Sequence, residues 1–269
     1  MAANGWSRWV RRLSEWMSGR APSGREGQRA KEGSLNPIQV PPAAGETRTL
    51  KLRGRVTMEM VWCPAGTFTM ENPTDGEGRD EGKTLRQMTQ MDGFWMAKYP
   101  VTQKQWKRVM GKKPSHFKGD SLPVEHVSWR ECLKFCKKTG LELPTEAQWE
   151  YACRAGGSGT FAGTKELEKV GWFYENSGWK TYSVGQKMPN EWGLFDMHGN
   201  VWEWCMDTAN TWADERVIRG GSCGDFAEDC LSACRRHANQ DFNEDPFGAP
   251  IMLIGFRPIA RQGLSGCGS

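Results

Sequence analysis

The sequence contains no long hydrophobic run. None of its segments approaches the ~20 consecutive apolar residues of a membrane-spanning helix. Its N-terminal part also lacks the continuous apolar stretch of ~7–15 residues that defines a secretory signal. The sequence therefore predicts no transmembrane helix and no export signal.

The number of cysteines does not suit a set of disulfides. Nine is an odd count, and without an export signal it indicates reduced thiols, so we expect a cytoplasmic protein. Cys132 and Cys136 lie four residues apart on the same stripe as Phe135, which favours packing in the core over a metal site. Cys230 and Cys234 have the same spacing and could share a helix face.

Tyrosine and histidine are scarce, with four of each, whereas Trp (14) and Gly (32) are abundant. Many tryptophans indicate a core of large flat side chains, and many glycines indicate many turns and few long helices. The histidines show no His-x-x-x-His spacing, and there is no glycine-rich phosphate-binding loop. Residues 220–224 match the Gly-x-Ser-x-Gly of hydrolases around Ser222, but no βαβ pattern precedes them, so we interpret the match as chance.

Positive charge is concentrated at the N-terminus. Residues 1–31 hold seven Lys and Arg against two Glu, so the rest of this chain of net charge +4 is nearly neutral. No basic face is indicated on the folded part, and we expect no nucleic-acid partner. Residues 1–17 place Trp6, Trp9 and Trp16 at helical spacing with arginines between them. They predict an amphipathic helix on a membrane surface or a partner, a helix packed on its own domain, or a disordered arm.

The amino-acid composition of the chain changes at about residue 55. Residues 18–54 are rich in Gly, Pro, Ser, Arg and Glu, and we expect a disordered basic linker there. Over 56–62 apolar and polar residues alternate, as on a half-buried strand. Further on, three Ser or Thr residues are each followed three positions later by Glu or Gln, which predicts capped helix starts, and a glycine ends each pattern. The pairs are Thr102–Gln105, Ser128–Glu131 and Thr145–Gln148, and the glycines are Gly111, Gly140 and Gly156.

Seven longer motifs are more specific. They are MVWCPAGTFTM (60–70), GFWMAKYPVTQKQW (93–106), LPVEHVSW (122–129), LELPTEAQWEYACRAG (141–156), GLFDMHGNVWEW (193–204), VIRGGS (217–222) and IGFRP (254–258). In this order they resemble the sulfatase-modifying-factor domain, the fold of the formylglycine-generating enzyme. The resemblance implies an α+β fold related to C-type lectins, with short helices and much irregular loop. It places the domain at residues 55–261 and leaves 262–269 as a flexible tail.

Oxygen donors recur every two or three residues from Asp196 to Glu203. Two of them are carboxylates, and backbone carbonyls near the glycine turn can supply the rest, which suits Ca²⁺. The alternative is a tight turn whose carboxylates cap backbone amides. The family resemblance implies a structural calcium at Asp196, Gly199, Val201 and Glu203. It also implies that Arg257 is a buried centre of ion pairs or hydrogen bonds rather than a substrate contact.

The resemblance also sets a test for catalysis. The formylglycine-generating enzyme oxidises a substrate cysteine with O₂ and holds Cu(I) on two cysteines that follow Gly-Gly-Ser; soft thiolates suit Cu(I). Here the first of these positions is Asp225, a hard carboxylate that binds Cu(I) poorly, and the second is Cys230. Cys223 lies two residues early, about 6.6 Å from position 225 on a strand. The copper pair is therefore incomplete.

Two functions remain open. The incomplete pair favours a binding module that presents the surface of residues 223–250 to an unknown protein or small-molecule ligand. The alternative is a copper- or iron-dependent oxidoreductase, of the sulfatase-modifying-factor or sulfoxide-synthase type, that acts on a thiol with O₂. Cys230, Cys223 and Ser222 are its candidate catalytic residues. Copper is expected only for the enzyme, and calcium for either.

Overall fold

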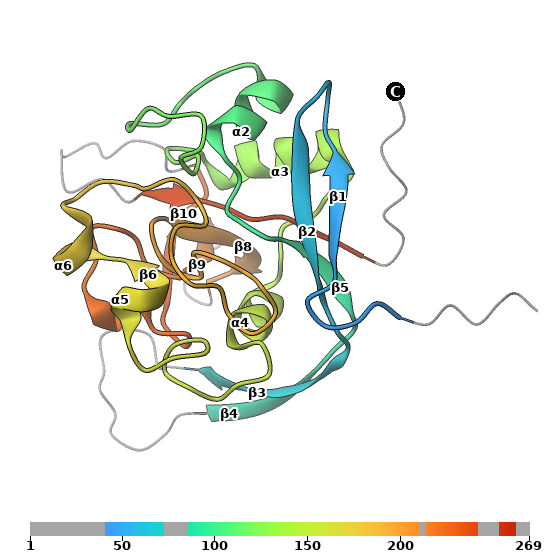
Figure 1. Cartoon of the computed structure of the whole chain (residues 1–269), viewed down its shortest axis with the longest axis vertical. Helices are drawn as coiled ribbons and strands as arrows, with labels where there is room; N and C mark the ends of the chain where they lie inside the picture. Colours follow the sequence, from blue (N-terminus) through green and yellow to red (C-terminus); the bar gives the residue numbers. More distant parts are fainter. Residues whose placement is uncertain (1–40, 73–84, 210–213, 242–252, 262–269) are drawn as a thin grey trace, which may run out of the picture. The chain divides into compact units, whose positions relative to one another are not determined.

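The computed structural model describes residues 41–72, 85–209, 214–241 and 253–261 (Figure 1). The predicted helix at 1–17 and tail at 262–269 lie outside these residues. Of the predicted linker at 18–54, residues 18–40 also lie outside them, whereas residues 47–51 form strand β1 (Thr47–Lys51), which pairs with the next strand. Only Leu50 of β1 is buried, so this edge strand lacks the apolar alternation by which a strand is recognised.

The first sheet has the strand order β1-β2-β5-β12 and is antiparallel throughout. Strand β2 (Thr57–Cys63) contains the predicted alternating segment, and β5 (Phe94–Ala97) lies beside it. The register pairs Trp62 with Trp95, whose ring centroids are 5.3 Å apart. The short β12 (Ile259–Ala260) brings the end of the described chain next to β5.

The second sheet, in the order β10-β9-β8-β11, carries the motifs of the second half of the chain. Strands β8 (Trp202–Thr208), β9 (Glu215–Arg219) and β10 (Arg235–Asn239) are antiparallel, whereas β11 (Ile254–Gly255) is parallel to β8. The described residues also form two sheets of two strands each. They are β3 (Gly66–Asn72) with β4 (Leu85–Met91), and β6 (Gly171–Trp172) with β7 (His198–Gly199).

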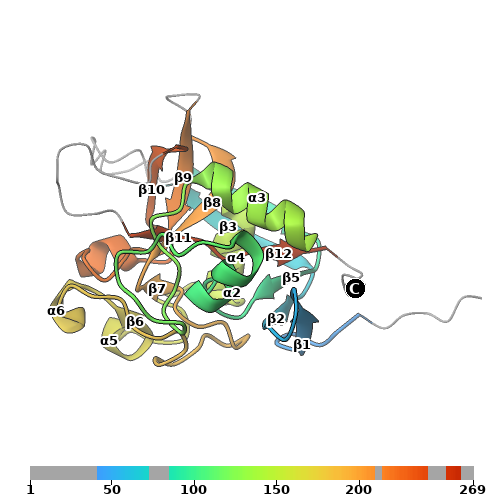
Figure 2. The same cartoon turned by 90° about the horizontal axis from the view of Figure 1, so that it is seen from above.

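The three predicted helices are confirmed, each with its capping box. They are α2 (Gln103–Met110), α3 (Trp129–Thr139) and α4 (Glu146–Arg154), and α2 and α3 lie next to each other (Figure 2). Left-handed residues end all three, Gly111 and Gly140 as predicted, but Ala155 (φ 47°) one position before the predicted glycine. The other helices of the described residues are single turns, namely α5 (Leu167–Val170), α6 (Tyr174–Ser177) and the 3₁₀ turn η1 (Ala227–Cys230).

Tryptophan and phenylalanine are prominent among the fully buried side chains, as the tryptophan content predicted. The ring of Trp106 on α2 stacks on Phe135 of α3, with centroids 5.7 Å apart. Cys132 and Cys136 are buried in the same core cluster, which confirms their packing role. Cys230 ends η1, so it does not share a helix face with Cys234. No helix in the described part of the chain has the length and apolarity that crossing a membrane requires.

Candidate functional site

Four separate segments surround a cavity of about 220 Å³. The loop after α2 supplies one wall, and Trp179, just after α6, supplies another. The segment after β9 forms the base, and Leu253 precedes β11. The lining residues are His116, Phe117, Trp179, Ser222, Cys223, Gly224, Asp225 and Leu253.

The base of this cavity is organised by Asp225. One carboxylate oxygen, Oδ2, accepts hydrogen bonds from the Ser222 hydroxyl, from the Ser222 backbone N–H at 3.1 Å and from Trp202 Nε1 at 2.8 Å. The other oxygen, Oδ1, lies 3.6 Å from the guanidinium of Arg236. Charge-assisted hydrogen bonds of this kind fix a carboxylate in one orientation. Asp225 is therefore a rigid anion at the base of the cavity.

The two candidate cysteines are both buried. Cys223 packs in an apolar cluster with Val201 and Leu253, whereas Cys230 packs in a different cluster around α5. Burial raises the pKa of Cys223 to about 12 and that of Cys230 well above its usual value, and the charge of Asp225 raises both further. Both groups are therefore protonated thiols at neutral pH, and Asp225 stands close to each.

Ser222 shows no arrangement for nucleophilic catalysis. Its hydroxyl donates to Asp225 and accepts from the N–H of Gly224 at 3.2 Å, and the side chain is buried. No histidine hydrogen-bonds to this hydroxyl among the described residues, and its carboxylate partner lies three positions along the same turn. Here the hydroxyl shapes the turn that carries Asp225, which agrees with the interpretation of the Gly-x-Ser-x-Gly match as chance.

The upper walls of the cavity are largely aromatic and apolar. Trp179 is 54% exposed, and its ring meets Tyr174 edge-on at 5.0 Å. Tyr174 also contacts Phe226, which is 51% exposed and directly follows Asp225. An exposed aromatic cluster beside a fixed carboxylate is the composition of a small-ligand site, because rings supply contact area and the anion supplies orientation.

A buried carboxylate, that of Glu125, fixes the loop that carries His116 and Phe117. Glu125 accepts hydrogen bonds from the backbone N–H groups of His116 at 2.9 Å and Phe117 at 3.0 Å. It also contacts Nδ1 of His126, a residue in the left-handed conformation (φ 58°). This wall is therefore fixed by polar contacts.

Glu203, the second carboxylate of the predicted calcium site, is committed to Arg257. Arg257 Nε lies 2.7 Å from Glu203 Oε2, and Arg257 Nη2 lies 2.8 Å from Oε1. Trp149 Nε1 donates to Oε2 at 2.7 Å, and all three side chains are buried. Arg257 also donates to backbone carbonyls, so its expected role as a buried centre of ion pairs and hydrogen bonds is confirmed. A cation at Glu203 would have to share this carboxylate with a guanidinium.

Asp196, the first carboxylate of that prediction, has a different environment. It is buried, and its oxygens accept from the N–H of Gly185 at 2.7 Å and from Asn200 Nδ2 at 3.4 Å. No ion pair reaches it among the residues that the structure describes. Burial raises the pKa of Asp196 to about 6, against the lowering effects of Gly185 and Arg257. A buried carboxylate without a cationic partner fits a metal ligand, whereas Glu203 fits less well.

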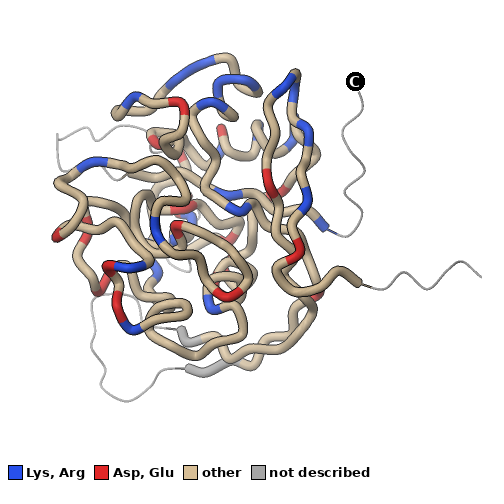
Figure 3. The backbone as a smooth tube through the Cα atoms, in the orientation of Figure 1, with Lys and Arg blue, Asp and Glu red and all other residues tan. Residues whose placement is uncertain are grey.

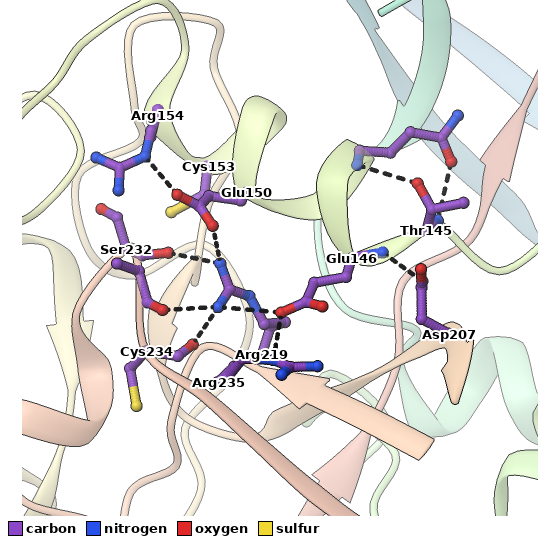
Figure 4. Close-up of polar contacts among 12 residues, drawn as sticks. Thr145, Glu146, Glu150, Cys153, Arg154, Asp207, Arg219, Ser232, Cys234 and Arg235 are labelled. Atoms are coloured by element: carbon purple, nitrogen blue, oxygen red, sulfur yellow. Dashed lines mark hydrogen bonds and ion pairs between the residues drawn. The ribbon is translucent and has the colours of Figure 1, made fainter. Parts of the chain in front are cut away.

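Arg219, at the end of β9, secures the segment next to the cavity base (Figure 4). Its Nη2 donates to Glu150 Oε2 of α4 at 2.5 Å and to the Ser232 carbonyl at 3.0 Å. Its Nη1 donates to the carbonyls of Ala233 at 2.8 Å and Cys234 at 2.7 Å. The chain that follows η1 is thereby fixed to α4, and this limits the movement of the base.

Sequence reasoning found part of this site. It singled out Ser222, Cys223 and Asp225, which line the cavity together. Of the predicted binding surface at 223–250, residues 242–250 lie outside the described residues, and only 223–225 line the cavity. His116, Phe117, Trp179 and Leu253 were missed because no local motif marks residues that meet only in the tertiary structure.

The family is established by comparison. The family model of the sulfatase-modifying factor enzyme 1-like domain matches residues 47–262, so the chain belongs to this family. This range includes β1, which lies before the predicted start of the domain at residue 55. The predicted α+β fold with short helices is also confirmed. The chain is similar to Treponema denticola variable protein 1, with a TM-score of 0.70, 25% identity, and coverage of 80% of this chain and 99% of that chain.

Curated relatives include proteins with different names. The chaperone protein LppX of Paenibacillus barcinonensis is 32% identical over 49% of this chain and 69% of its own length. The formylglycine-generating enzyme of Mus musculus is 27% identical over 61% and 66%, respectively. The inactive C-alpha-formylglycine-generating enzyme 2 of the same species is 29% identical over 77% and 71%. Because the family contains both an enzyme and a relative named inactive, family membership does not establish whether this chain is active, and the question depends on the residues of its own site.

Proposed function

We propose that this domain is a binding module whose ligand enters the cavity above Asp225. The observation that carries the proposal is the fixed carboxylate: Ser222 and Trp202 hold Asp225 where the family's first copper cysteine is expected. A carboxylate in this position orients a ligand but does not supply the soft sulfur that Cu(I) requires.

The lining defines the chemistry of the ligand. Phe117, Trp179 and Leu253 suit an apolar or aromatic body, and Asp225 suits a hydrogen-bond donor or a cationic head. At about 220 Å³ the cavity accepts a small molecule or one side chain of a peptide. We therefore propose ligands that join an aromatic or aliphatic body to an amine, presented as small molecules or as part of a protein partner.

A screen with matched fragments tests this proposal. Ligand-observed NMR on the full chain would compare aromatic amines with carboxylic acids of the same shape. We expect amines to bind, and binding to be lost in Asp225→Asn and in Trp179→Ala. Asp229→Asn is the matched control, because Asp229 also pairs with Arg236 but does not line the cavity. Absence of amine binding, or binding that persists in both cavity variants, would refute the proposal.

The oxidoreductase alternative has less support. It needs Cys223 and Cys230 as joint ligands of copper, yet their side chains pack in separate clusters. Asp225 lies between them in sequence, and its negative charge raises the pKa of both thiols. We therefore assign no electron-transfer or oxygen step to these residues.

Calcium is retained as a proposal in a narrower form. Asp196 would provide the carboxylate, and the carbonyls of Gly199 and Val201 the neutral oxygen donors. Glu203 would serve mainly as the partner of Arg257. A bound Ca²⁺ would neutralise the buried Asp196 and tie the turn before β8 to the rest of the domain.

We also propose a reducing, cytoplasmic location. All the cysteines that the structure describes are free, and most of them are buried. Thiols that remain unpaired are typical of a compartment in which glutathione and thioredoxin keep them reduced. Fractionation of cells that express the full chain, with cytosolic and envelope markers, tests this location.

A further inference from the structure

Basic residues gather on one face of the domain, although its net charge is nearly neutral. Figure 3 shows lysines and arginines over α2, over the chain that follows it, and at the tip of the β1–β2 hairpin. In the segments 47–57, 103–113 and 129–139 the only acidic residue is Glu131. Their exposed cations include Arg48 and Arg130, which form ion pairs with Glu46 and Asp241, and we call the others the basic face. They are Lys51, Arg53, Arg55, Lys104, Lys107, Arg108, Lys112, Lys113, Lys134, Lys137 and Lys138.

Contacts between these segments show that the face is continuous. Arg108 on α2 donates from Nε to the carbonyl of Arg53 at 2.7 Å, which joins the hairpin tip to α2. Lys138 on α3 donates to the carbonyl of Val109 at 3.4 Å, and Lys112 forms an ion pair with Glu131. The three segments are therefore neighbours in the folded domain, although they are far apart in sequence.

Few of these charges are neutralised. Within the described residues, only Lys112 and Lys113 of the basic face form ion pairs, with Glu131 and Asp120. A hydrogen bond from Lys113 and the charges of Lys107 and Lys104 lower the pKa of Asp120, so the field around this loop is positive. Like charges held this close repel one another, and an anionic partner would relieve that repulsion.

We propose that the basic face binds the surface of a bilayer that contains anionic lipid. The face presents mainly lysines, which act as compact point charges and lack the fork geometry with which arginine recognises bases. The large exposed apolar side chains of the described residues, such as Trp179 and Phe226, lie on other segments, so the face offers no rings for stacking bases. This inference does not depend on the proposed ligand cavity.

The sequence of the N-terminal arm favours a bilayer over a nucleic acid. Residues 1–17 combine Trp6, Trp9 and Trp16 with arginines, the residue types that are enriched at the headgroup level of membranes. The anionic leaflet in cells faces the cytoplasm, which agrees with the proposed location.

Vesicle sedimentation with the full chain tests the proposal. We expect binding to vesicles of phosphatidylcholine mixed with phosphatidylserine, no binding to phosphatidylcholine alone, and weaker binding as salt is raised. The variant with Lys104→Gln, Lys107→Gln and Lys134→Gln should bind about a hundredfold more weakly, since each basic residue near such a surface contributes roughly fivefold. None of these three side chains makes a hydrogen bond within the described residues, so folding should be unaffected, as circular dichroism can verify.

A matched control removes three exposed lysines from another part of the surface. The variant with Lys165→Gln, Lys169→Gln and Lys180→Gln loses the same charge and should bind vesicles like the wild type. Equal loss in both triple variants would show a response to net charge alone and would overturn the proposal. No loss in either would assign binding to other parts of the chain, with the same consequence. Tighter binding to duplex DNA or RNA than to vesicles at equal salt would identify a nucleic-acid surface instead.

Discussion

The guanidinium of Arg257 grips both carboxylate oxygens of Glu203, with its closest contact at 2.7 Å, and both side chains are fully buried. Their positions are 54 residues apart in sequence, and the parallel pairing of β8 with β11 brings them together. Two buried charges are tolerated here because they form an ion pair with each other and because Trp149 Nε1 donates a further hydrogen bond to Glu203.

Loss of one member of this pair should therefore be costly. Glu203→Ala leaves a buried guanidinium without its anion, and we expect unfolding free energy to fall by about 3–5 kcal/mol. Urea unfolding of the wild type and the variant measures this change. The control is Arg261→Ala, which breaks the exposed pair of Arg261 with Glu142 and should change stability by less than about 1 kcal/mol. Similar losses in the two variants would contradict the assigned role.

Calcium should stabilise the domain through Asp196. Calcium at a hundredfold excess over its Kd should add about 2.7 kcal/mol if it binds only the folded state. Calorimetry with calcium and with excess chelator should give different midpoints for the wild type and the same midpoint for Asp196→Asn. Asp196→Asn tests the calcium site more specifically than removal of Glu203, because loss of Glu203 would also leave the buried Arg257 without its ion-pair partner. Equal wild-type midpoints would eliminate the site.

Stability should decline in acid because of His198. Burial lowers the pKa of His198 to about 4, and its ring accepts from the N–H of Ala162 at 3.0 Å while Nδ1 contacts the Cys230 carbonyl. The unfolded state therefore takes up the proton first, and stability falls as pH drops from about 6.5 to 4, on the order of 3 kcal/mol. Urea titrations across this range measure the slope, which should flatten in His198→Gln.

Asp196 should oppose this trend. Its folded-state pKa of about 6 exceeds its unfolded value, so the folded state binds the proton first and gains stability as pH falls through this range without calcium. Asp196→Asn should consequently lose stability in acid more steeply than the wild type. An equal or shallower acid decline in this variant would show that the folded state does not raise the pKa of Asp196.

A peptide with the sequence Cys-x-Pro-x-Arg should remain unmodified by this protein when Cu(I), thiol reductant and O₂ are supplied. Asp225 removes one of the two soft ligands that such chemistry needs. Mass spectrometry of the peptide detects any aldehyde product. Asp225→Cys should create activity if the rest of the scaffold is intact. Conversion by the wild type that disappears in both Cys223→Ser and Cys230→Ser would instead establish those cysteines as a working pair.

Local sequence patterns were sufficient for the elements whose signals lie within a few residues. The capping boxes at Thr102, Ser128 and Thr145 predicted three helices because the reciprocal hydrogen bonds span only one turn. The ordered motifs predicted the family and the fold. Strand β1 was missed because it has one buried residue, and an edge strand is specified mainly by its neighbour.

The sequence by itself determined the family, the helix starts and the presence of Asp225 where the family resemblance implies a copper-binding cysteine. Only the tertiary structure decided what surrounds Asp225: it places Trp179 and Phe117 in the cavity wall and Trp202 on the carboxylate. It also turned a nearly neutral composition into a strongly basic face. The reason is physical, since charge and cavity shape depend on which distant segments the sheets and helices bring together, and composition averages over all of them.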